Sequence, residues 1–201
     1  KVSDIAAGEI ATIQWSEQLA IISICESIPD QSALFVGSSR PVRDVEAFCH
    51  PRSGIEVFAN RGLAGIDGNI STIFGIAREF QNTFAILGDL TFLHDISALT
   101  NSASENIRIY VIDNNGGAIF STLPQRGSHG FETVFGTPHG LNPAKIAESM
   151  GFAAKQISNL KELEAEIKAP ISGISVVVCD VPDRESNADN LKAIYTSLNS
   201  M

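Results

Sequence analysis

Two short polar segments in this sequence each follow an apolar run and carry candidate oxygen ligands. Gly88-Asp89-Leu90-Thr91 ends one run, and Asp113-Asn114-Asn115-Gly116-Gly117 ends the next. Carboxylate, amide and carbonyl oxygens suit Mg²⁺, which completes its near-octahedral shell with phosphate and water. Free N–H groups of a helix that begins near Thr91 would favour a diphosphate at the same place. The segments therefore predict a site for a metal-bound diphosphate, formed by Asp89, Asn114 and a glycine carbonyl.

Each segment also has a simpler interpretation. Asp89 on its own is a typical N-cap residue, and Asn-Asn-Gly-Gly on its own is a typical turn. The two segments support the metal-site interpretation only together, because parallel strands bring their carboxyl ends to the same edge of a sheet.

The surrounding elements are predicted from the apolar periodicity. Helical spacing extends over residues 15–28, and short runs rich in Val, Ile or Phe predict six strands. The strands are expected at residues 33–36, 55–58, 83–87, 107–112, 152–157 and 174–179. Further helices are expected at residues 41–48, 69–80, 91–101, 143–150, 160–168 and 184–198.

This alternation of strands and helices predicts the fold class. Strands that are apolar on both faces belong to a sheet covered on each side, and the crossovers between parallel strands are right-handed. We expect an α/β fold with a doubly wound, mainly parallel six-stranded sheet. Ligands of such sheets bind beyond the carboxyl ends of the strands.

Composition narrows the class of protein. The 201 residues contain 14 Lys and Arg against 23 Asp and Glu, a net charge of −9, which disfavours nucleic acid and anionic lipid as partners. No apolar run is long enough to span a bilayer. Cys25, Cys49 and Cys179 are far apart and set among apolar neighbours, so we expect reduced, buried thiols and a cytoplasmic protein.

One long segment has no periodicity. Residues 123–141 are rich in Gly and Pro, and a loop of that length in a compact domain is more often a lid or a partner surface than a simple connection. The four histidines, of which His129 and His139 lie in this segment, show no metal-ligand spacing.

The spacing from Gly88-Asp89 to Asn114 resembles the thiamine diphosphate motif of decarboxylase-like and transketolase-like enzymes. The resemblance implies that Asp89, the Asn114 side chain and the Gly116 carbonyl bind Mg²⁺ or Mn²⁺. It further implies that Gly88, Leu90, Thr91 and Gly117 lie against the cofactor. Many members have glycine where this chain has Leu90.

A narrower resemblance covers most of the chain. Segments 38–44, 60–68, 88–95 and 114–124 are similar to the family of 2-succinyl-5-enolpyruvyl-6-hydroxy-3-cyclohexene-1-carboxylate (SEPHCHC) synthases, the MenD family of menaquinone biosynthesis. This resemblance implies a transferase that decarboxylates 2-oxoglutarate on thiamine diphosphate. The resulting succinyl carbanion equivalent is added to isochorismate.

Both implied substrates are dianions, and Arg side chains pair bidentately with carboxylates. By resemblance, Ser39, Arg43 and Arg61 contact the acceptor or the cofactor-bound adduct, whereas Arg40 reads more simply as a loop arginine. Ile66 is implied as the residue that bends the cofactor. An apolar wall beside the cofactor ring is implied for Ile119, Phe120 and Leu123, although these residues would look the same in an ordinary core.

The resemblance also implies a domain organisation. Residues 1–12 are expected to be a residual linker and residues 13–201 the diphosphate-binding domain, while the pyrimidine-binding domain, with its activating glutamate, and the middle domain are absent from this chain. The complete enzyme is implied to be a homodimer or homotetramer, in which the pyrimidine domain of a second subunit completes each site. The isolated chain should then be inactive.

Two alternatives stay open. Asp89 and Asn114 alone fit another thiamine diphosphate-dependent synthase or decarboxylase, such as an acetolactate-synthase-like enzyme, although a small neutral acceptor would not need Arg43 and Arg61. A binding-only domain that kept the fold without turnover is the alternative from another class.

Overall fold

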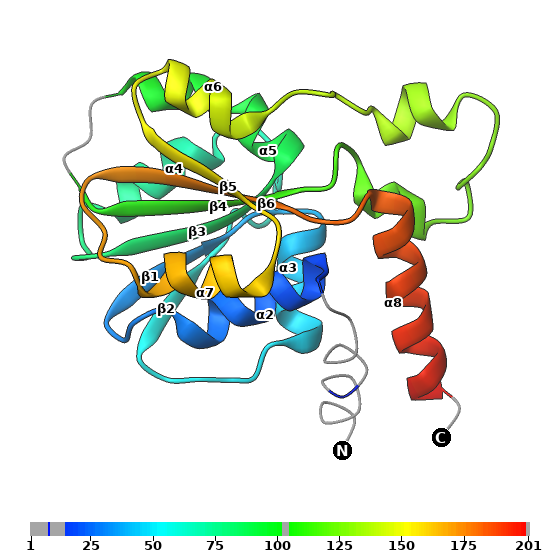
Figure 1. Cartoon of the computed structure of the whole chain (residues 1–201), viewed down its shortest axis with the longest axis horizontal. Coiled ribbons are helices and arrows are strands. Elements are labelled where there is room, and N and C mark those ends of the chain that lie inside the picture. The colour runs from blue at the N-terminus through cyan, green and yellow to red at the C-terminus, as the bar shows by residue number, and fades with distance from the viewer. Residues whose placement is uncertain (1–7, 9–14, 102–104, 200–201) are drawn as a thin grey trace.

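The computed structural model describes residue 8, residues 15–101 and residues 105–199. The linker predicted at residues 1–12 lies outside these ranges apart from Gly8. Figure 1 shows a central sheet with helices on both sides and a last helix, α8, that extends beyond the sheet.

The sheet contains the six predicted strands, and every neighbouring pair is parallel. Their order is β2-β1-β3-β4-β6-β5. The strands are β1 (Ser32–Val36), β2 (Ile55–Phe58), β3 (Thr83–Gly88), β4 (Ile107–Asp113), β5 (Ala153–Ile157) and β6 (Ile174–Asp180). The predicted α/β class and parallel sheet are confirmed.

Helices cover both faces of the sheet. One face packs against α2 (Glu17–Ser27), α3 (Arg40–Phe48) and α7 (Leu160–Lys168). The other face packs against α4 (Asn69–Ile76), α5 (Asp89–His94), the 3₁₀ turn η1 (Ile96–Thr100) and α6 (Pro143–Ser149). The remaining elements are the 3₁₀ turn η2 (Ala118–Thr122), the π-helical turn η3 (Glu132–Gly136) and α8 (Arg184–Asn199).

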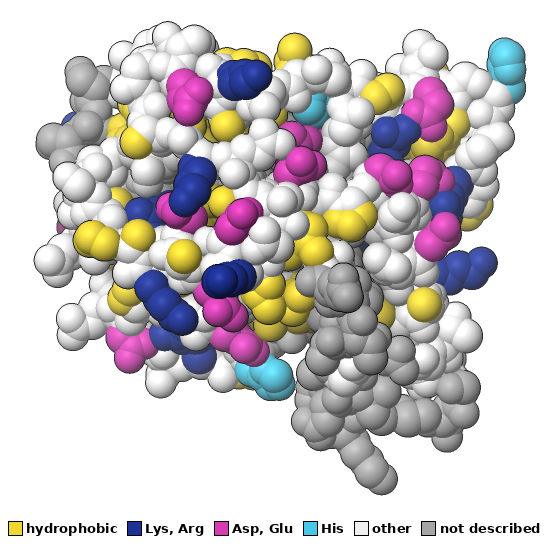
Figure 2. Space-filling view, viewed as in Figure 1, with side chains coloured by type: hydrophobic (Ala, Val, Ile, Leu, Met, Phe, Trp, Pro, Cys, Tyr) yellow, Lys and Arg dark blue, Asp and Glu magenta, His cyan; other side chains and the backbone are white. Residues whose placement is uncertain are grey.

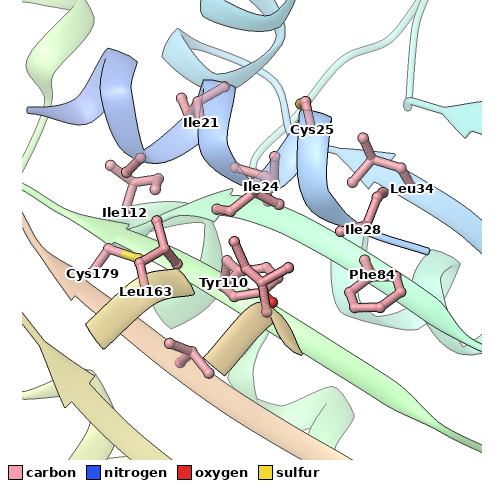
Figure 3. Close-up of a cluster of buried hydrophobic side chains, with 14 of the residues drawn as sticks. Ile21, Ile24, Cys25, Ile28, Leu34, Phe84, Tyr110, Ile112, Leu163 and Cys179 are labelled. Carbon is pink, nitrogen blue, oxygen red and sulfur yellow. The ribbon is translucent and has the colours of Figure 1, made fainter. Parts of the chain in front are cut away.

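The two cores follow from the period-two alternation of the strands. In β1, Leu34 and Val36 belong to the cluster under α2, whereas Phe35 between them points to the opposite cluster. Figure 3 shows the first cluster, in which Ile24 of α2 lies over Tyr110 of β4. Each fully buried large apolar side chain contributes roughly 1.5–3 kcal/mol relative to its exposed state. The sheet is therefore a rigid platform for the loops at its carboxyl edge.

The helix predicted at residues 91–101 is wrong in its extent. It begins two residues earlier, at Asp89, and gives way to a 3₁₀ turn after Asp95. The Asp95 carboxylate accepts a hydrogen bond from the backbone N–H of Ser71, 3.0 Å away in the first turn of α4. Because α4 has Gly68 as its N-cap, with no capping side chain, Asp95 supplies that cap from a distant segment.

Two smaller expectations are also corrected. The helix predicted at residues 69–80 ends at Ile76. Of the three thiols, all free, Cys25 and Cys179 are buried, but Cys49 is only half-buried.

Within the described part of the chain, no helix is long and apolar enough to cross a membrane. Acidic and basic side chains are interspersed on the face shown in Figure 2, without a continuous basic patch there.

The topology decides where a ligand can bind. The chain leaves β1 for α3 on one face of the sheet and leaves β3 for α5 on the other face, although β1 and β3 are neighbours. Diverging connections open a crevice beyond the carboxyl ends of such strands. The candidate residues lie at this edge.

Candidate cofactor and metal site

The ends of β3 and β4 bring Asp89 and Asn114 together. Gly88 pairs with Ile112 across the two strands, so the residues that follow lie side by side. Asp89 is 2% exposed and Asn114 is 5% exposed. The carboxylate and the amide are thus both withdrawn from bulk water at the point where a sheet of this topology binds ligands.

Asp89 is fixed by backbone donors from both segments. Its Oδ1 accepts from its neighbour Leu90 N–H at 2.6 Å, and its Oδ2 accepts from Gly116 N–H at 2.8 Å. These bonds orient the carboxylate and join the loop after β3 to the loop after β4.

Gly116 and Gly117 allow the backbone of a third segment, at residues 135–136, to pack closely against the loop after β4. A Cβ on Gly116 would lie 2.2 Å from the carbonyl oxygen of Gly136, and a Cβ on Gly117 would lie 2.2 Å from that of Phe135. Gly117 N–H also donates to the Gly136 carbonyl at 2.8 Å. Gly116 has φ of 140°, which other residues rarely adopt. Part of the long segment 123–141 therefore packs directly on the predicted metal-binding loop.

That segment brings His139 into the site, which the sequence did not indicate. Its Nε2 lies 3.2 Å from Asp89 Oδ2 and 3.6 Å from Asp113 Oδ1. Its Nδ1 accepts from Leu141 N–H at 3.0 Å, so Nε2 carries the proton that is donated to Asp89. Potential ligand atoms of Asp89, Asp113 and His139 all lie within 4.8 Å of one another.

The surroundings of Asp89 raise the pKa values of two groups beside it, the Asp113 carboxyl and the His139 imidazole. Burial, followed by the Asp89 charge, raises the pKa of Asp113 to about 6. The hydrogen bond to Asp89 raises the pKa of His139 above its usual value. His139 was missed because it stands between Pro138 and Gly140 in a segment without periodicity, 50 residues after Asp89 in the sequence.

Glu17, the first residue of α2, is a second acidic group that the sequence did not single out. It is 2% exposed, and burial, with the nearby Asp44 carboxyl as the next cause, raises its pKa to about 8. Burial likewise raises the pKa of Asp44 to about 7, although Asp44 is paired with Arg40. An acidic residue in the first turn is ordinary in any helix, so the sequence carried no signal for Glu17.

A cavity of about 460 Å³ opens at this edge of the sheet. Nearly all of the residues predicted for cofactor and substrate line it. They are Ser39, Arg43, Arg61, Ile66, Gly88, Asp89, Leu90, Thr91, Asn114, Gly116, Gly117, Ile119 and Phe120, joined by Glu17, Ser38, Arg40, Pro41, Ala64 and Ala118. The structure thus brings together residues from five separate segments.

The arginines of the cavity differ in exposure. Arg43 and Arg61 are exposed, and Arg43 donates to the Ser39 carbonyl at 2.7 Å. Ser39 itself has φ of 73°, an unfavourable conformation for a residue with a side chain and one that concentrates at ligand sites. Arg40 is buried against Asp44 at the start of α3, so its interpretation as a surface arginine of a loop is wrong.

Leu123 is the predicted site residue that the structure does not bring to this cavity. It lines a larger cavity of about 690 Å³ between η2 and α8, together with Arg126 and Tyr195. The η2 turn ends at Thr122, so the chain has already left the cofactor side when it reaches Leu123.

Segment 123–141 is fastened to α8. Arg184 of α8 is paired with Glu132 and donates to the Asn115 carbonyl at 3.3 Å. Arg126 is paired with Glu185 at 2.5 Å and with Asp189 at 2.7 Å. Ion pairs with α8 therefore hold this segment near its start and at its middle.

The residues fit a magnesium or manganese diphosphate. The Asn114 Oδ1 is buried without a hydrogen-bond partner among the described residues, so it is free to bind a cation. The carboxylate of Asp89 and the amide oxygen of Asn114 are hard donors of the type that Mg²⁺ takes. A diphosphate would bring the remaining oxygens and the negative charge to balance the cation.

Comparison with known families identifies the same class of site. Residues 43–181 match the model of "Thiamine pyrophosphate enzyme, C-terminal TPP binding domain".

Two proteins that are similar to this chain have the same name. A 2-succinyl-5-enolpyruvyl-6-hydroxy-3-cyclohexene-1-carboxylate synthase of Thermobifida fusca is 45% identical over 132 residues, which cover 62% of this chain and 24% of the relative. The enzyme of the same name from Corynebacterium diphtheriae is 35% identical over 186 residues, covering 86% of this chain and 36% of the relative. The chain therefore spans only about a quarter to a third of the length of these relatives.

A solved structure shares the fold. A protein from Mycobacterium smegmatis, described as a thiamin diphosphate-dependent enzyme, superposes with a TM-score of 0.62 at 21% identity. The superposition covers 85% of this chain and 32% of that protein.

Proposed function

This chain belongs to the thiamine pyrophosphate enzymes and carries their C-terminal TPP-binding domain, and on that premise we propose that it is the diphosphate- and metal-binding domain of a SEPHCHC synthase. The complete enzyme would be a transferase of menaquinone biosynthesis that joins 2-oxoglutarate, after decarboxylation, to isochorismate. The observation that carries the proposal is the Asn114 Oδ1, which is buried beside Asp89 at adjacent strand ends and has no hydrogen-bond partner in the described part of the chain.

In this proposal Asp89, the Asn114 amide oxygen and the Gly116 carbonyl would hold Mg²⁺ or Mn²⁺, which would neutralise the charge of the diphosphate. Thiamine diphosphate, when bound, supplies the electron sink that permits loss of carbon dioxide from a 2-oxo acid. Asp89 is held in place for its role by the N–H groups of Leu90 and Gly116. The protein thereby orients its ligands before the cation arrives.

The apolar and basic parts of the cavity would serve the substrates. Ile66, Ile119 and Phe120 line it and would exclude water from the reacting end of the cofactor. Arg43 and Arg61 present guanidinium groups to incoming dianions, and a bidentate pair with a carboxylate fixes position as well as charge. A dicarboxylate substrate explains two exposed arginines on the rim of a cavity in an acidic chain.

We further propose that the site is completed by a pyrimidine-binding domain of a second subunit, in a homodimer or homotetramer. The relatives are roughly three to four times longer than the part that this chain matches, which leaves room for such a domain in them. The chain alone should then bind cofactor weakly and have no turnover.

The test combines binding with activity. Thermal unfolding of this chain with millimolar thiamine diphosphate and Mg²⁺ measures affinity, because ligand at a hundred times its Kd stabilises by about 2.7 kcal/mol. Decarboxylation of 2-oxoglutarate is then assayed for the chain alone and for a protein that also carries the amino-terminal region of a relative. Turnover only in the second case is expected. Robust turnover by the chain alone contradicts the half-site proposal.

The outcome also separates the alternatives. A restored protein that binds cofactor and decarboxylates pyruvate in preference to 2-oxoglutarate favours an acetolactate-synthase-like enzyme. A restored protein that binds cofactor without turnover of either acid favours a binding-only domain.

A further inference from the structure

The end of segment 123–141 is fastened to the loop after β4 by one side chain. Asn115 Oδ1 accepts from the backbone N–H of His139 at 3.1 Å and from that of Gly140 at 2.8 Å. Asn115 itself has φ of 61°, a left-handed conformation that asparagine adopts more readily than most residues. The backbone at His139 is therefore held in place independently of the contacts that its imidazole makes.

The His139 imidazole, whose side chain is 8% exposed, acts as a hydrogen-bond donor at this position. Leu141 N–H donates to Nδ1 at 3.0 Å, so the neutral ring carries its proton on Nε2. A charged ring would carry a hydrogen on Nε2 as well, so the donor is present in both forms. A nitrogen that carries a hydrogen cannot bind a cation. His139 is therefore not a metal ligand in this arrangement, although it lies beside two carboxylates.

The acceptor of this hydrogen bond is Asp89. Its Oδ2 lies 3.2 Å from His139 Nε2. Asp113 Oδ1, at 3.6 Å, is too distant for a hydrogen bond with the ring and accepts from Asn115 N–H at 3.1 Å instead. The imidazole is thus directed at a residue of the proposed ligand set.

The hydrogen bonds of Asp89 decide which of its oxygens is open. Oδ2 accepts from Gly116 N–H and from His139 Nε2, whereas Oδ1 accepts only from Leu90 N–H among the described residues. A carboxylate has about four acceptor sites, two on each oxygen. Both sites of Oδ2 are therefore filled, and the site that is left for a cation is on Oδ1.

We propose that His139 is a positioning residue for the metal site, because its Nε2–H fills the second acceptor site of Asp89 Oδ2 and leaves Oδ1 to bind a divalent cation. The inference rests on the proposed function, since it requires Asp89 to be a metal ligand. Segment 123–141 then supplies a donor to the carboxylate in addition to the two backbone donors of the strand-end loops. Asn115, in turn, acts on the metal through the placement of His139.

The first experiment compares His139→Phe and His139→Gln with wild type in the 201-residue chain. Binding of Mn²⁺ in the presence of thiamine diphosphate is followed by electron paramagnetic resonance of the free ion, well below the Tm of each variant. Loss of a hydrogen-bond partner of a ligating carboxylate typically costs about tenfold to a hundredfold in metal affinity. We expect that loss for His139→Phe, which keeps a ring but has no donor. His139→Gln can present an amide N–H near the place of Nε2 and should recover most of the affinity.

The second experiment tests whether Asn115 acts through His139. Asn115→Gly removes the acceptor of the two backbone N–H groups, and glycine adopts a positive φ without strain. We expect Asn115→Gly to weaken Mn²⁺ binding by no more than His139→Phe does, and to have no further effect in the His139→Phe background. Equal losses in both backgrounds overturn the link, because independent sites add.

The third experiment separates a donor from a ligand. Affinities for Mg²⁺ and Ni²⁺ are measured by competition with Mn²⁺ in wild type and His139→Phe. Imidazole nitrogen suits Ni²⁺, whereas Mg²⁺ prefers oxygen. A positioning role predicts that His139→Phe weakens the binding of both ions by the same factor. A loss confined to Ni²⁺ overturns it and makes His139 a ligand.

Failure of the inference can be told from failure of the proposed function. Equal Mn²⁺ affinities for wild type and His139→Phe overturn the positioning role and leave the cofactor site standing. Tighter binding by His139→Phe also overturns it, and shows that the imidazole competes with the cation for Asp89. A lower metal-free Tm for His139→Phe with unchanged affinity shows a structural role only. No Mn²⁺ uptake by wild type at millimolar thiamine diphosphate overturns both.

Discussion

The cavity has two sides that are built in opposite ways. The acidic wall, formed by Glu17, Asp89 and Asn114, is no more than 5% exposed at any of these residues, and its Asp89 carboxylate accepts from the backbone N–H groups of Leu90 and Gly116. The basic rim, formed by Arg43 and Arg61, is exposed, and its one described hydrogen bond joins Arg43 to the Ser39 carbonyl.

This difference shows which ligand the chain can prepare for by itself. Buried acids are costly without a cation, so a bound metal would relieve the unfavourable energy of the acidic wall. Exposed arginines cost little, and they would lose side-chain freedom only on binding a substrate. Under the proposed function, the acidic wall is preorganised within this chain, whereas the basic rim would become ordered with its ligand.

The largest effect is expected from removing the Asp89 carboxylate from the acidic wall. Asp89→Ala removes a carboxylate that is hydrogen-bonded to both strand-end loops, and metal-dependent thiamine diphosphate binding should fall at least about a hundredfold. Calorimetric titration with and without Mg²⁺ measures this loss. Asp89→Asn is the matched variant, because it keeps an acceptor for Gly116 N–H while losing the charge. Wild-type affinity in both variants would show that the metal binds elsewhere.

The next effect concerns the basic rim. Arg43→Ala and Arg61→Ala should each lower kcat/KM of the complete enzyme for one dianionic substrate by about tenfold to a hundredfold, the value of a charge-assisted hydrogen bond. Affinity for Mn²⁺ should not change, because neither arginine contacts the acidic wall. Steady-state kinetics with both substrates varied provides the measurement. Arg78→Ala is the control, because Arg78 is exposed and paired with Glu105 away from the cavity.

The contrast between the two sides also explains what the sequence could predict. The strands can be predicted because a buried strand appears in the sequence as a short apolar run. The Asp89–Asn114 pair can then be predicted because both residues follow neighbouring strands of a parallel sheet. Ligand residues that follow strands can be recognised in this way, since the sheet itself sets their position.

The missed residues depend on contacts between distant segments. His139 reaches Asp89 from an aperiodic loop, and Asp95 caps α4 instead of continuing its own helix. Glu17 resembles any acidic residue at a helix start until α8 and β4 are packed around it. Local pattern does not encode which distant group a polar side chain will meet, so these roles required the three-dimensional structure.

A smaller effect should appear in the pH dependence of the metal-free chain. The pKa values of Glu17, Asp44 and Asp113 are raised to about 8, 7 and 6, each chiefly by burial. The folded chain thus holds protons that the unfolded chain releases. The stability that these three groups contribute is fully present below their ordinary pKa values and is lost as pH rises toward 8. His139, whose pKa is also raised, acts in the same direction.

Thermal unfolding without metal, measured from about pH 5.5 to 8.5, should therefore show a falling Tm. Each additional bound proton corresponds to about 1.4 kcal/mol per pH unit. Glu17→Gln cannot titrate, so its curve should be flatter near pH 7 to 8. A Tm that rises with pH over this range would contradict the idea that the acidic wall is unfavourable when empty.

The smallest expected effect tests where the cavity ends. Leu123 was predicted beside the cofactor, but it is 40% exposed and lines the separate cavity next to α8. Leu123→Ala should therefore change cofactor affinity in the presence of Mg²⁺ by less than about twofold, and partial exposure limits its cost in stability to below about 1.5 kcal/mol. Phe120→Ala is the matched comparison, because Phe120 lies three residues earlier, lines the cofactor cavity and packs against Phe135 at a ring-centroid distance of 5.3 Å. Removing that ring opens the apolar part of the cavity to water and loosens the segment that carries His139, so its effect on affinity should exceed that of Leu123→Ala. The reverse order would mean that the chain turns back toward the cofactor after η2 when the complete enzyme assembles, as the resemblance alone implied.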